Sequence, residues 1–181
     1  MKTSELLKAM QVDFDNGELL PDLYKKYKND DISEKRLSTL LGNLKDKNLI
    51  KKHKTANKIL IALMCILTLF TVLIGYAFGV NSGSSSPIYW SLIAIIPAMF
   101  TYGFIKKNQG AYIAYIFLSL SQLPKSFEGF GENIMVDVSG LVISISLVAL
   151  VWYVKSKLFP YMGFIGPKKD KNKQYAVQAY S

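Results

Sequence analysis

Four stretches of the chain are apolar, with few or no charges, and shorter polar segments separate them. The stretches 59–80 and 88–105 contain no charged residue, and a helix needs about 20 residues to cross the hydrocarbon core of a bilayer. Both are therefore predicted to be membrane-spanning helices. A further span is predicted at 136–157, where Lys155 and Lys157 can extend to the lipid interface while their stems stay in apolar surroundings.

The apolar stretch at 110–126 is weaker, because its continuous apolar part runs only from Ala111 to Leu123. Judged by length, this part also suits a buried or re-entrant helix. We nevertheless predict that it spans the membrane, because the distribution of lysines along the chain requires a crossing here.

Lysines gather in three groups next to the apolar stretches. The groups are Lys45, Lys47, Lys51, Lys52, Lys54 and Lys58; Lys106 and Lys107; and Lys155, Lys157, Lys168, Lys169, Lys171 and Lys173. Cytoplasmic loops of membrane proteins are enriched in Lys and Arg, so all three groups are expected in the cytoplasm. The connections 81–87 and 122–137 have no excess of positive charge and are expected outside. This alternation requires four crossings.

The sequence thus predicts an all-α, polytopic membrane protein in three parts. Residues 1–57 are expected to form a basic cytoplasmic helical region, residues 58–159 four transmembrane helices, and residues 160–181 a basic cytoplasmic tail. No apolar run lies near Met1, so no cleavable signal peptide is expected. The expected location is the inner membrane of a bacterium. Juxtamembrane lysines, which attract anionic headgroups, account for much of the net charge of +9.

Three short amphipathic helices are predicted within the first 57 residues. Thr3 is expected to cap the first helix and the Asp15-Asn16-Gly17 turn to end it, while Pro21 suits the first turn of the second. Ser33 is expected to cap the third. The third helix carries leucines at the spacing of one helical face, namely Leu37, Leu40, Leu41 and Leu44. We expect this face to pack in a small bundle or to contact a cytoplasmic partner.

Residues 31–50, DISEKRLSTLLGNLKDKNLI, resemble the recognition-helix part of a winged-helix domain. The resemblance implies a helix that presents basic side chains such as Lys35 and Arg36 to DNA. A winged helix also requires a strand hairpin after this helix, and residues 51–57 leave no room for one before the first span. We therefore do not expect nucleic acid as a partner.

Catalytic and metal-binding patterns are missing from the sequence. His53 is the single histidine and Cys65 the single cysteine, so a histidine-based metal cluster and an intrachain disulfide are both excluded. The acidic residues around Gly17 do not have the spacing of a calcium loop. No phosphate-binding loop or nucleophile motif occurs. We expect no enzyme activity, no metal and no cofactor.

Small residues inside the spans are the candidate interaction site. Glycine or serine residues one helical turn apart allow another helix to approach closely, and serines can hydrogen-bond across such a contact. The residues concerned are Gly75 and Gly79 in the first span and Ser139, Gly140, Ser144 and Ser146 in the fourth. The sequence leaves open whether the partner helix belongs to the same chain or to another.

The expected function is that of a non-enzymatic interaction protein in the lipid bilayer, an accessory or regulatory subunit that binds another membrane protein or a second copy of itself. An immunity-type protein against a pore-forming toxin is one specific version, by analogy of class. The alternative is a small homo-oligomeric channel or carrier. A pathway of that kind would use Pro97, which can kink the second span, but the spans carry few ionisable groups.

Overall fold

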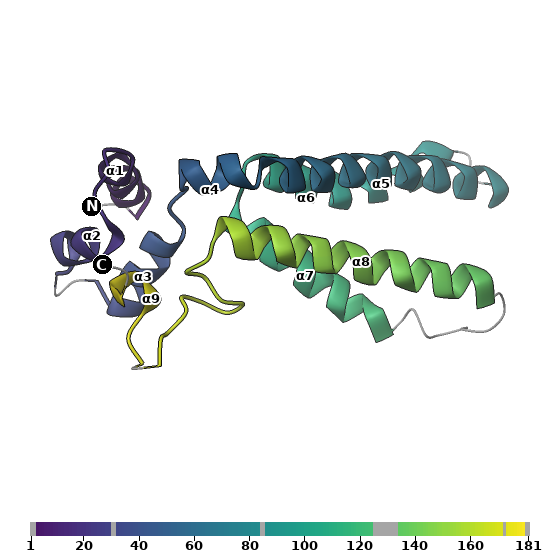
Figure 1. Cartoon of the computed structure of the whole chain (residues 1–181). Coiled ribbons are helices and arrows are strands. Elements are labelled where there is room, and N and C mark those ends of the chain that lie inside the picture. The colour runs from purple at the N-terminus through teal and green to yellow at the C-terminus, as the bar shows by residue number, and fades with distance from the viewer. Residues whose placement is uncertain (1–2, 30–31, 84–85, 125–133, 172, 180–181) are drawn as a thin grey trace. The chain divides into compact units, whose positions relative to one another are not determined.

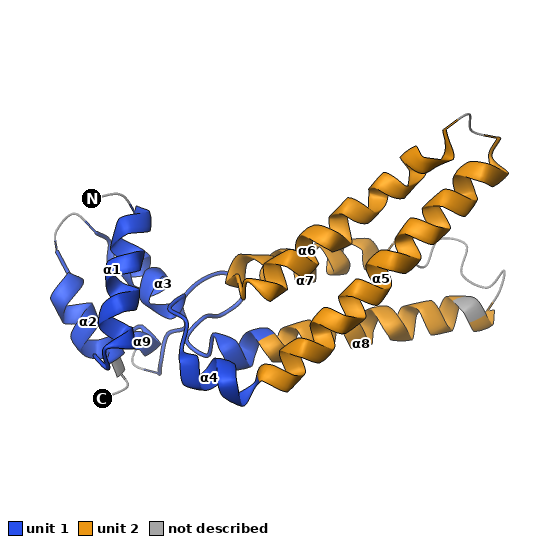
Figure 2. Cartoon of the chain, turned by 90° about the horizontal axis from the view of Figure 1, so that it is seen from above, with its two compact units in different colours: residues 1–53, 155–181 blue, residues 54–154 orange. Residues whose placement is uncertain are grey.

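The structure is a computed structural model that describes residues 3–29, 32–83, 86–124, 134–171 and 173–179. The described residues are helical apart from turns and two isolated antiparallel bridges, Met162 with Pro167 and Lys169 with Tyr175 (Figure 1). The predicted all-α fold class is confirmed. The chain divides into two compact units, which Figure 2 colours separately. Unit 1 comprises residues 1–53 and 155–181, and unit 2 comprises residues 54–154.

Unit 1 is built from short helices at both ends of the chain. They are α1 (Thr3–Asp15), α2 (Leu20–Tyr27), α3 (Glu34–Gly42), α4 (Lys47–Lys52) and α9 (Ala176–Ala179). The residues that follow α3 form α4, and residues 51–57 are helical apart from a turn at His53.

Local sequence signals explain some of the helix ends in unit 1. Gly17, just after α1, has φ of 99°, a conformation that glycine adopts without the penalty of a Cβ atom. Pro21 lies in the first turn of α2, as predicted. Ser33 occupies the capping position of α3 but makes no capping hydrogen bond with its side chain, and Thr3 already belongs to α1. Neither the cap predicted at Ser33 nor the one predicted at Thr3 is therefore found in the structure.

The core of unit 1 joins the two ends of the chain. Its buried members are Leu6, Met10, Leu20, Leu23, Tyr24, Leu37, Leu40, Leu41, Leu44 and Val177. Val177 is fully buried among them, and residues 155–181 belong to the same compact unit as residues 1–53. Short helices leave much of their apolar surface uncovered, and the C-terminal segment covers part of it.

Unit 2 contains the long apolar helices. They are α5 (Lys54–Asn81), the 3-10 helix η1 (Pro87–Ala94), α6 (Ile95–Ile105), α7 (Gln109–Gln122) and most of α8 (Ile134–Leu158). Along its length α5 packs against η1 and α6, which run beside it in Figure 2, and α6 in turn packs against α7.

Among the described residues, three helices are long and apolar enough to cross a membrane: Lys54–Asn81, Pro87–Ile105 and Asp137–Leu158. They correspond to the spans predicted at 59–80, 88–105 and 136–157. The span predicted at 110–126 has no such counterpart, because α7 is only 14 residues long and ends at Gln122. Positions 125 and 126 lie outside the described residues. The helices fit a membrane protein, but three of them are long enough, not four.

Pro97 does not mark the irregularity of the second span. The change from 3-10 to α-helix falls between Ala94 and Ile95. Pro97 lies in the first turn of α6, shortly after this change. The Pro97 carbonyl accepts a hydrogen bond from the Thr101 hydroxyl at 2.8 Å. The change of helix type in the second span therefore lies just before Pro97.

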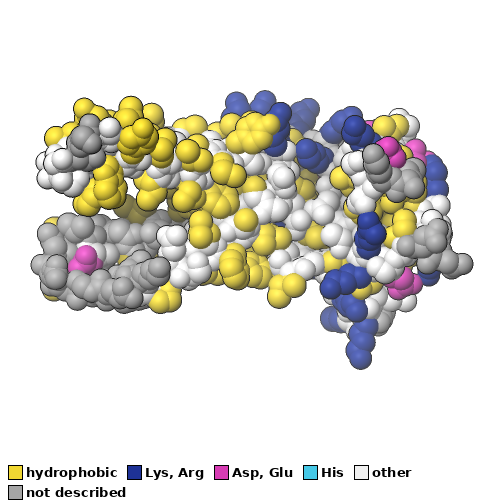
Figure 3. All heavy atoms as spheres, turned by 180° about the vertical axis from the view of Figure 1, so that it is seen from behind, with side chains coloured by type: hydrophobic (Ala, Val, Ile, Leu, Met, Phe, Trp, Pro, Cys, Tyr) yellow, Lys and Arg dark blue, Asp and Glu magenta, His cyan; other side chains and the backbone are white. Residues whose placement is uncertain are grey.

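Large apolar side chains cover much of the surface of unit 2. Leu69, Ile74 and Met99, for example, are 64%, 66% and 69% exposed. Figure 3 shows hydrophobic side chains over one part of the face in view and Lys and Arg gathered over the rest. Soluble proteins rarely expose an apolar surface of this extent, whereas lipid chains are a suitable surrounding for it.

Candidate functional site

The N-terminal half of α8 carries the small residues that the sequence singled out. Ser139, Gly140, Ser144 and Ser146 are all exposed. A Cβ atom added to Gly140 would meet no described atom within 4 Å. The other half of the helix is packed, since Val151 and Val154 are fully buried. The face of α8 that carries Gly140 is thus left open by the described helices of this chain.

A cavity of about 360 Å³ lies beside this half of α8 within unit 2. Ile143, Ser144 and Leu147 of α8 form one side of it, and residues of α5, η1, α6 and α7 form the rest. The lining is mostly apolar. Its side chains with polar groups are Thr71, Tyr115, Ser119, Gln122 and Ser144. Of the predicted site residues, Ser144 is the one that faces this cavity.

The glycine pair of α5 is placed differently from that of α8. A Cβ atom on Gly75 would come within 2.5 Å of the Trp90 carbonyl oxygen, and one on Gly79 within 2.7 Å of Pro87 Cα. The Ser91 hydroxyl reinforces the contact by donating to the Val72 carbonyl at 3.1 Å. Gly75 and Gly79 therefore hold η1 against α5 inside the chain, which is the close approach that small residues permit.

Leucines of the third predicted helix lie in the core of unit 1. The exposed fractions of Leu37, Leu40, Leu41 and Leu44 are 0%, 9%, 1% and 6%. Their neighbours include helices α1, α2 and α9. As the structure stands, this leucine face packs within the chain and is not presented to a cytoplasmic partner.

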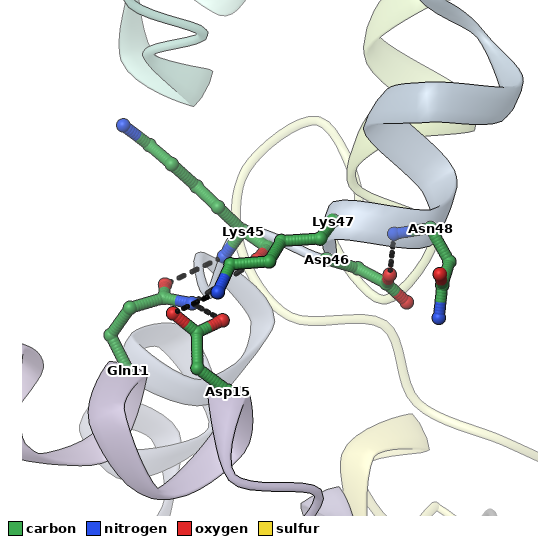
Figure 4. A network of polar contacts seen from close by, with 6 residues as sticks. All are labelled: Gln11, Asp15, Lys45, Asp46, Lys47 and Asn48. Atoms are coloured by element: carbon green, nitrogen blue, oxygen red, sulfur yellow. Dashed lines mark hydrogen bonds and ion pairs between the residues drawn. The ribbon is translucent and has the colours of Figure 1, made fainter.

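Polar contacts fix α1 to the connection between α3 and α4 (Figure 4). The Gln11 side chain donates to the Lys45 carbonyl at 3.1 Å and accepts from the Lys45 amide at 2.9 Å. Lys47 forms an ion pair with Asp15 at 3.0 Å. The Asp46 carboxylate caps α4 by accepting from the amides of Asn48 and Leu49. This network holds the last segment before α5 in a fixed conformation.

The Asp13 carboxylate on α1 accepts hydrogen bonds from two side chains of α2. Lys26 Nζ lies 2.7 Å from a carboxylate oxygen of Asp13, and the Tyr27 hydroxyl donates to the same oxygen at 2.7 Å. The hydrogen bond from Lys26, followed by that from Tyr27, lowers the pKa of the Asp13 carboxyl below its ordinary value of 3.8. Lys26 also pairs with Glu18, and these two carboxylates raise the pKa of its ammonium group. The cluster is structural, because it links α1 to α2.

A second cavity, of about 220 Å³, lies in unit 1. Apolar side chains dominate its lining, including Leu19, Leu41, Leu44 and Leu158. Its carboxylate, Asp46, is already engaged as the cap of α4. Within the described ranges no group of three or more His, Cys, Asp or Glu side chains is arranged to hold a metal ion. Neither cavity therefore presents a constellation suited to acid–base or metal chemistry.

The burial of Lys155 was not predicted from the sequence. Lys155 was predicted to extend to the lipid interface, but its side chain is buried, and Nζ donates to the carbonyls of Met162 and Gly163. The glycine-rich sequence from Gly163 to Gly166 was the available signal, since such a segment can fold back and offer its carbonyls to a lysine. Lys155 therefore binds backbone carbonyls of its own chain instead of extending freely into the surroundings, while Lys157 is exposed.

No protein-family model matches the chain, and neither a curated protein nor a solved structure matches it. The support for a function therefore comes from the geometry of the open α8 face and its cavity.

Proposed function

We propose that this chain is a non-enzymatic integral membrane interaction protein that binds a transmembrane helix of another membrane protein along the N-terminal half of α8. The observation that carries the proposal is the exposed pair Gly140 and Ser144, one helical turn apart on α8, with Ser144 lining a cavity of about 360 Å³. An immunity-type role is the version in which the bound protein is a pore-forming toxin.

The chemistry of this face suits a helix as the occupant. Gly140 allows a second backbone to approach, because nothing described lies within 4 Å of its Cβ position. Serine hydroxyls on the same half of α8 can hydrogen-bond to a neighbouring helix within the bilayer. The apolar cavity next to Ser144 can receive large side chains from that helix. By contrast, the glycine face of α5 is already filled by η1.

We further propose that the chain crosses a bacterial inner membrane four times, with both ends in the cytoplasm. Unit 1 contains both ends of the chain, with Val177 buried among residues of α1 to α3. A folded unit of this kind lies on one side of a bilayer, so the number of crossings is even. The three long helices therefore need one more crossing, for which α7 is the candidate.

The length of α7 makes its crossing a demanding one. Its 14 residues extend about 21 Å as an α-helix, against about 30 Å for a typical hydrocarbon core. A short span is accommodated by local thinning of the bilayer and by flanking residues that reach the interface. The lysines at 106 and 107, just before α7, favour the cytoplasm for that connection.

Topology is tested by labelling single cysteines in intact cells, in a background with Cys65→Ser. We expect Ser82→Cys to react with an impermeant reagent and Lys106→Cys to react only after the cells are opened. Labelling of Lys106→Cys in intact cells would overturn the four-crossing proposal. Labelling of Lys171→Cys from outside would overturn the same-side placement of the two ends.

The interaction is tested with a photo-crosslinking residue at position 144 in native membranes. We expect a discrete adduct with a membrane protein, and we expect Gly140→Leu to abolish it because the added side chain blocks close approach. Val142→Leu, which enlarges an exposed neighbour on the same half of α8, is the matched control and should retain the adduct. A probe at Met99 serves as the lipid-facing control. If position 144, like Met99, yields lipid adducts only, the proposed site is wrong.

The polar groups of the cavity favour one alternative, a small homo-oligomeric channel or carrier. Thr71, Ser119, Gln122 and Ser144 line the same cavity from three different helices. A pathway predicts that cysteines introduced at these positions react with a water-soluble reagent in a continuous row. An adduct at position 144 with a second copy of the chain, together with such labelling, would replace the interaction proposal with this one.

A further inference from the structure

A turn after α8 presents an apolar side chain at its tip. The turn Gly163–Gly166 lies between the bridged residues Met162 and Pro167. It is closed by a 2.7 Å hydrogen bond from the Gly163 amide to the Gly166 carbonyl. Ile165 is 91% exposed. Contact of such a side chain with water is unfavourable, so an apolar surrounding would be favoured.

The buried Lys155 fixes where this turn lies along α8. Its ammonium group donates to the Met162 carbonyl at 2.8 Å and to the Gly163 carbonyl at 2.5 Å. The Cα–Cβ bonds of a helix tilt towards its N-terminus, so a helical lysine extends back along its own helix. The base of the turn is therefore level with the last turn of α8 and not beyond it. Figure 1 shows the yellow-green segment after α8 turning back towards that end of the helix.

Aromatic residues near the end of α8 indicate where the last turn of this helix lies relative to a bilayer. Trp152 and Tyr153, just before Lys155, are 44% and 47% exposed. Aromatic rings of these two types gather where the hydrocarbon core meets the headgroups. The α8 segment Asp137–Leu158 is one of the helices long enough to span. The turn is thus held at the membrane–water interface on the side where α8 ends.

Charge adds a second feature that points to lipid. Lys157 on α8 and Lys168 and Lys169, which follow the turn, are all exposed. Lysines next to an interfacial apolar residue attract anionic headgroups. Together, a clamped turn, an exposed isoleucine at its tip and flanking lysines form a surface whose chemistry matches an anionic bilayer leaflet.

We propose that the turn Gly163–Gly166 is a lipid anchor, in which Ile165 inserts into the interfacial region of the bilayer and the flanking lysines bind anionic headgroups. The anchor gives unit 1 an attachment to the bilayer in addition to its covalent links to α5 and α8. The anchor depends only on the crossing of the membrane by α8. The anchor can therefore fail while the proposed helix-binding function stands, and helix binding can fail while the anchor stands.

The test uses the full chain with Cys65→Ser, reconstituted into vesicles of phosphatidylcholine alone or with phosphatidylglycerol. Ile165→Cys carries a polarity-sensitive fluorophore, and Lys171→Cys, on the same C-terminal segment, is the matched control. We expect the label at 165 to be quenched by nitroxide groups placed high on the lipid acyl chains, and to be about three-fold less quenched by aqueous iodide than the label at 171. Quenching by nitroxide lipid should fall by about two-fold when Lys168 and Lys169 are both changed to Gln in anionic vesicles.

Equal iodide quenching at the two positions would overturn the anchor. Protection from iodide without quenching by nitroxide lipid would also overturn it, because protein and not lipid would then cover Ile165. Lipid quenching that is the same in both vesicle types, and unaffected by the lysine substitutions, would overturn the part of the proposal that assigns headgroup binding to the lysines.

Discussion

The hydroxyl of Tyr112 donates a 2.7 Å hydrogen bond to the side-chain oxygen of Asn57. Tyr112 is fully buried and Asn57 is 5% exposed, and the Tyr112 ring stacks on Phe104 with centroids 4.6 Å apart. The bond joins the short helix α7 to the first turns of α5. Asn57 was predicted to precede the first span, but it lies inside α5, on the face that continues through Leu60 and Met64.

Removing this hydroxyl should weaken unit 2. The substitution Tyr112→Phe keeps the stacked ring and leaves the buried Asn57 oxygen without its donor, which costs about 1–3 kcal/mol. Unfolding of the purified chain by increasing mole fractions of a denaturing detergent measures the change. Tyr102→Phe, at a 63% exposed ring, is the control and should leave the unfolding midpoint unchanged. A midpoint for Tyr112→Phe equal to that of the control would contradict the role given to this bond.

The glycines of α5 and α8 should respond differently to the same added methyl group. Gly75→Ala places a Cβ atom 2.5 Å from the Trp90 carbonyl oxygen, so η1 must move away from α5. We expect a loss of about 1–3 kcal/mol in the same unfolding measurement. Gly140→Ala adds its methyl group to open space and should be neutral or slightly stabilising. If Gly75→Ala is as stable as Gly140→Ala, Gly75 is not required for the close contact of α5 with η1.

Val177 should stabilise the N-terminal helices even though it lies near the other end of the chain. It is fully buried in their core, so Val177→Ala removes buried methyl groups and should cost unit 1 about 1–3 kcal/mol. The rate at which trypsin cleaves residues 1–53 of the membrane-inserted chain measures the change. Lys171→Arg, at an exposed position, keeps the charge and the cleavage site and should leave that rate as it is. Equal protection in Val177→Ala would argue against a core shared by both ends.

Acid should destabilise unit 1 through Asp13. Its pKa is lowered in the folded chain, chiefly by the hydrogen bond from Lys26. A lowered carboxyl pKa adds stability above the ordinary value of 3.8, and this stability is lost as the pH falls through the folded pKa. We expect the wild type to lose more stability than Asp13→Asn between about pH 4 and pH 2. The rate of cleavage by an acid-active protease, measured across this pH range, gives the change in stability. Parallel pH curves for the wild type and Asp13→Asn would contradict the prediction.

The sequence determined the all-α class and most of the secondary structure of this protein. A charge-free apolar run such as 59–80 forms a long helix, the conformation in which a segment in hydrocarbon satisfies its own backbone hydrogen bonds. Helix ends at Asp15 and the first turn of α2 at Pro21 follow from the local properties of glycine and proline. The leucine face that begins at Leu37 follows from spacing alone, because residues three and four apart share one side of a helix.

Tertiary structure decided which faces meet. Asn57 and Tyr112 are 55 residues apart, and Val177 is still farther from the leucines it covers, so no local pattern pairs them. The two small-residue pairs have the same spacing, yet η1 fills the face of Gly75 while that of Gly140 stays open. Lys155 is buried because the chain folds back and offers it two carbonyls. Such contacts depend on how helices pack in space. Spacing along the chain predicts which side chains share a helix face, but not which element packs against that face.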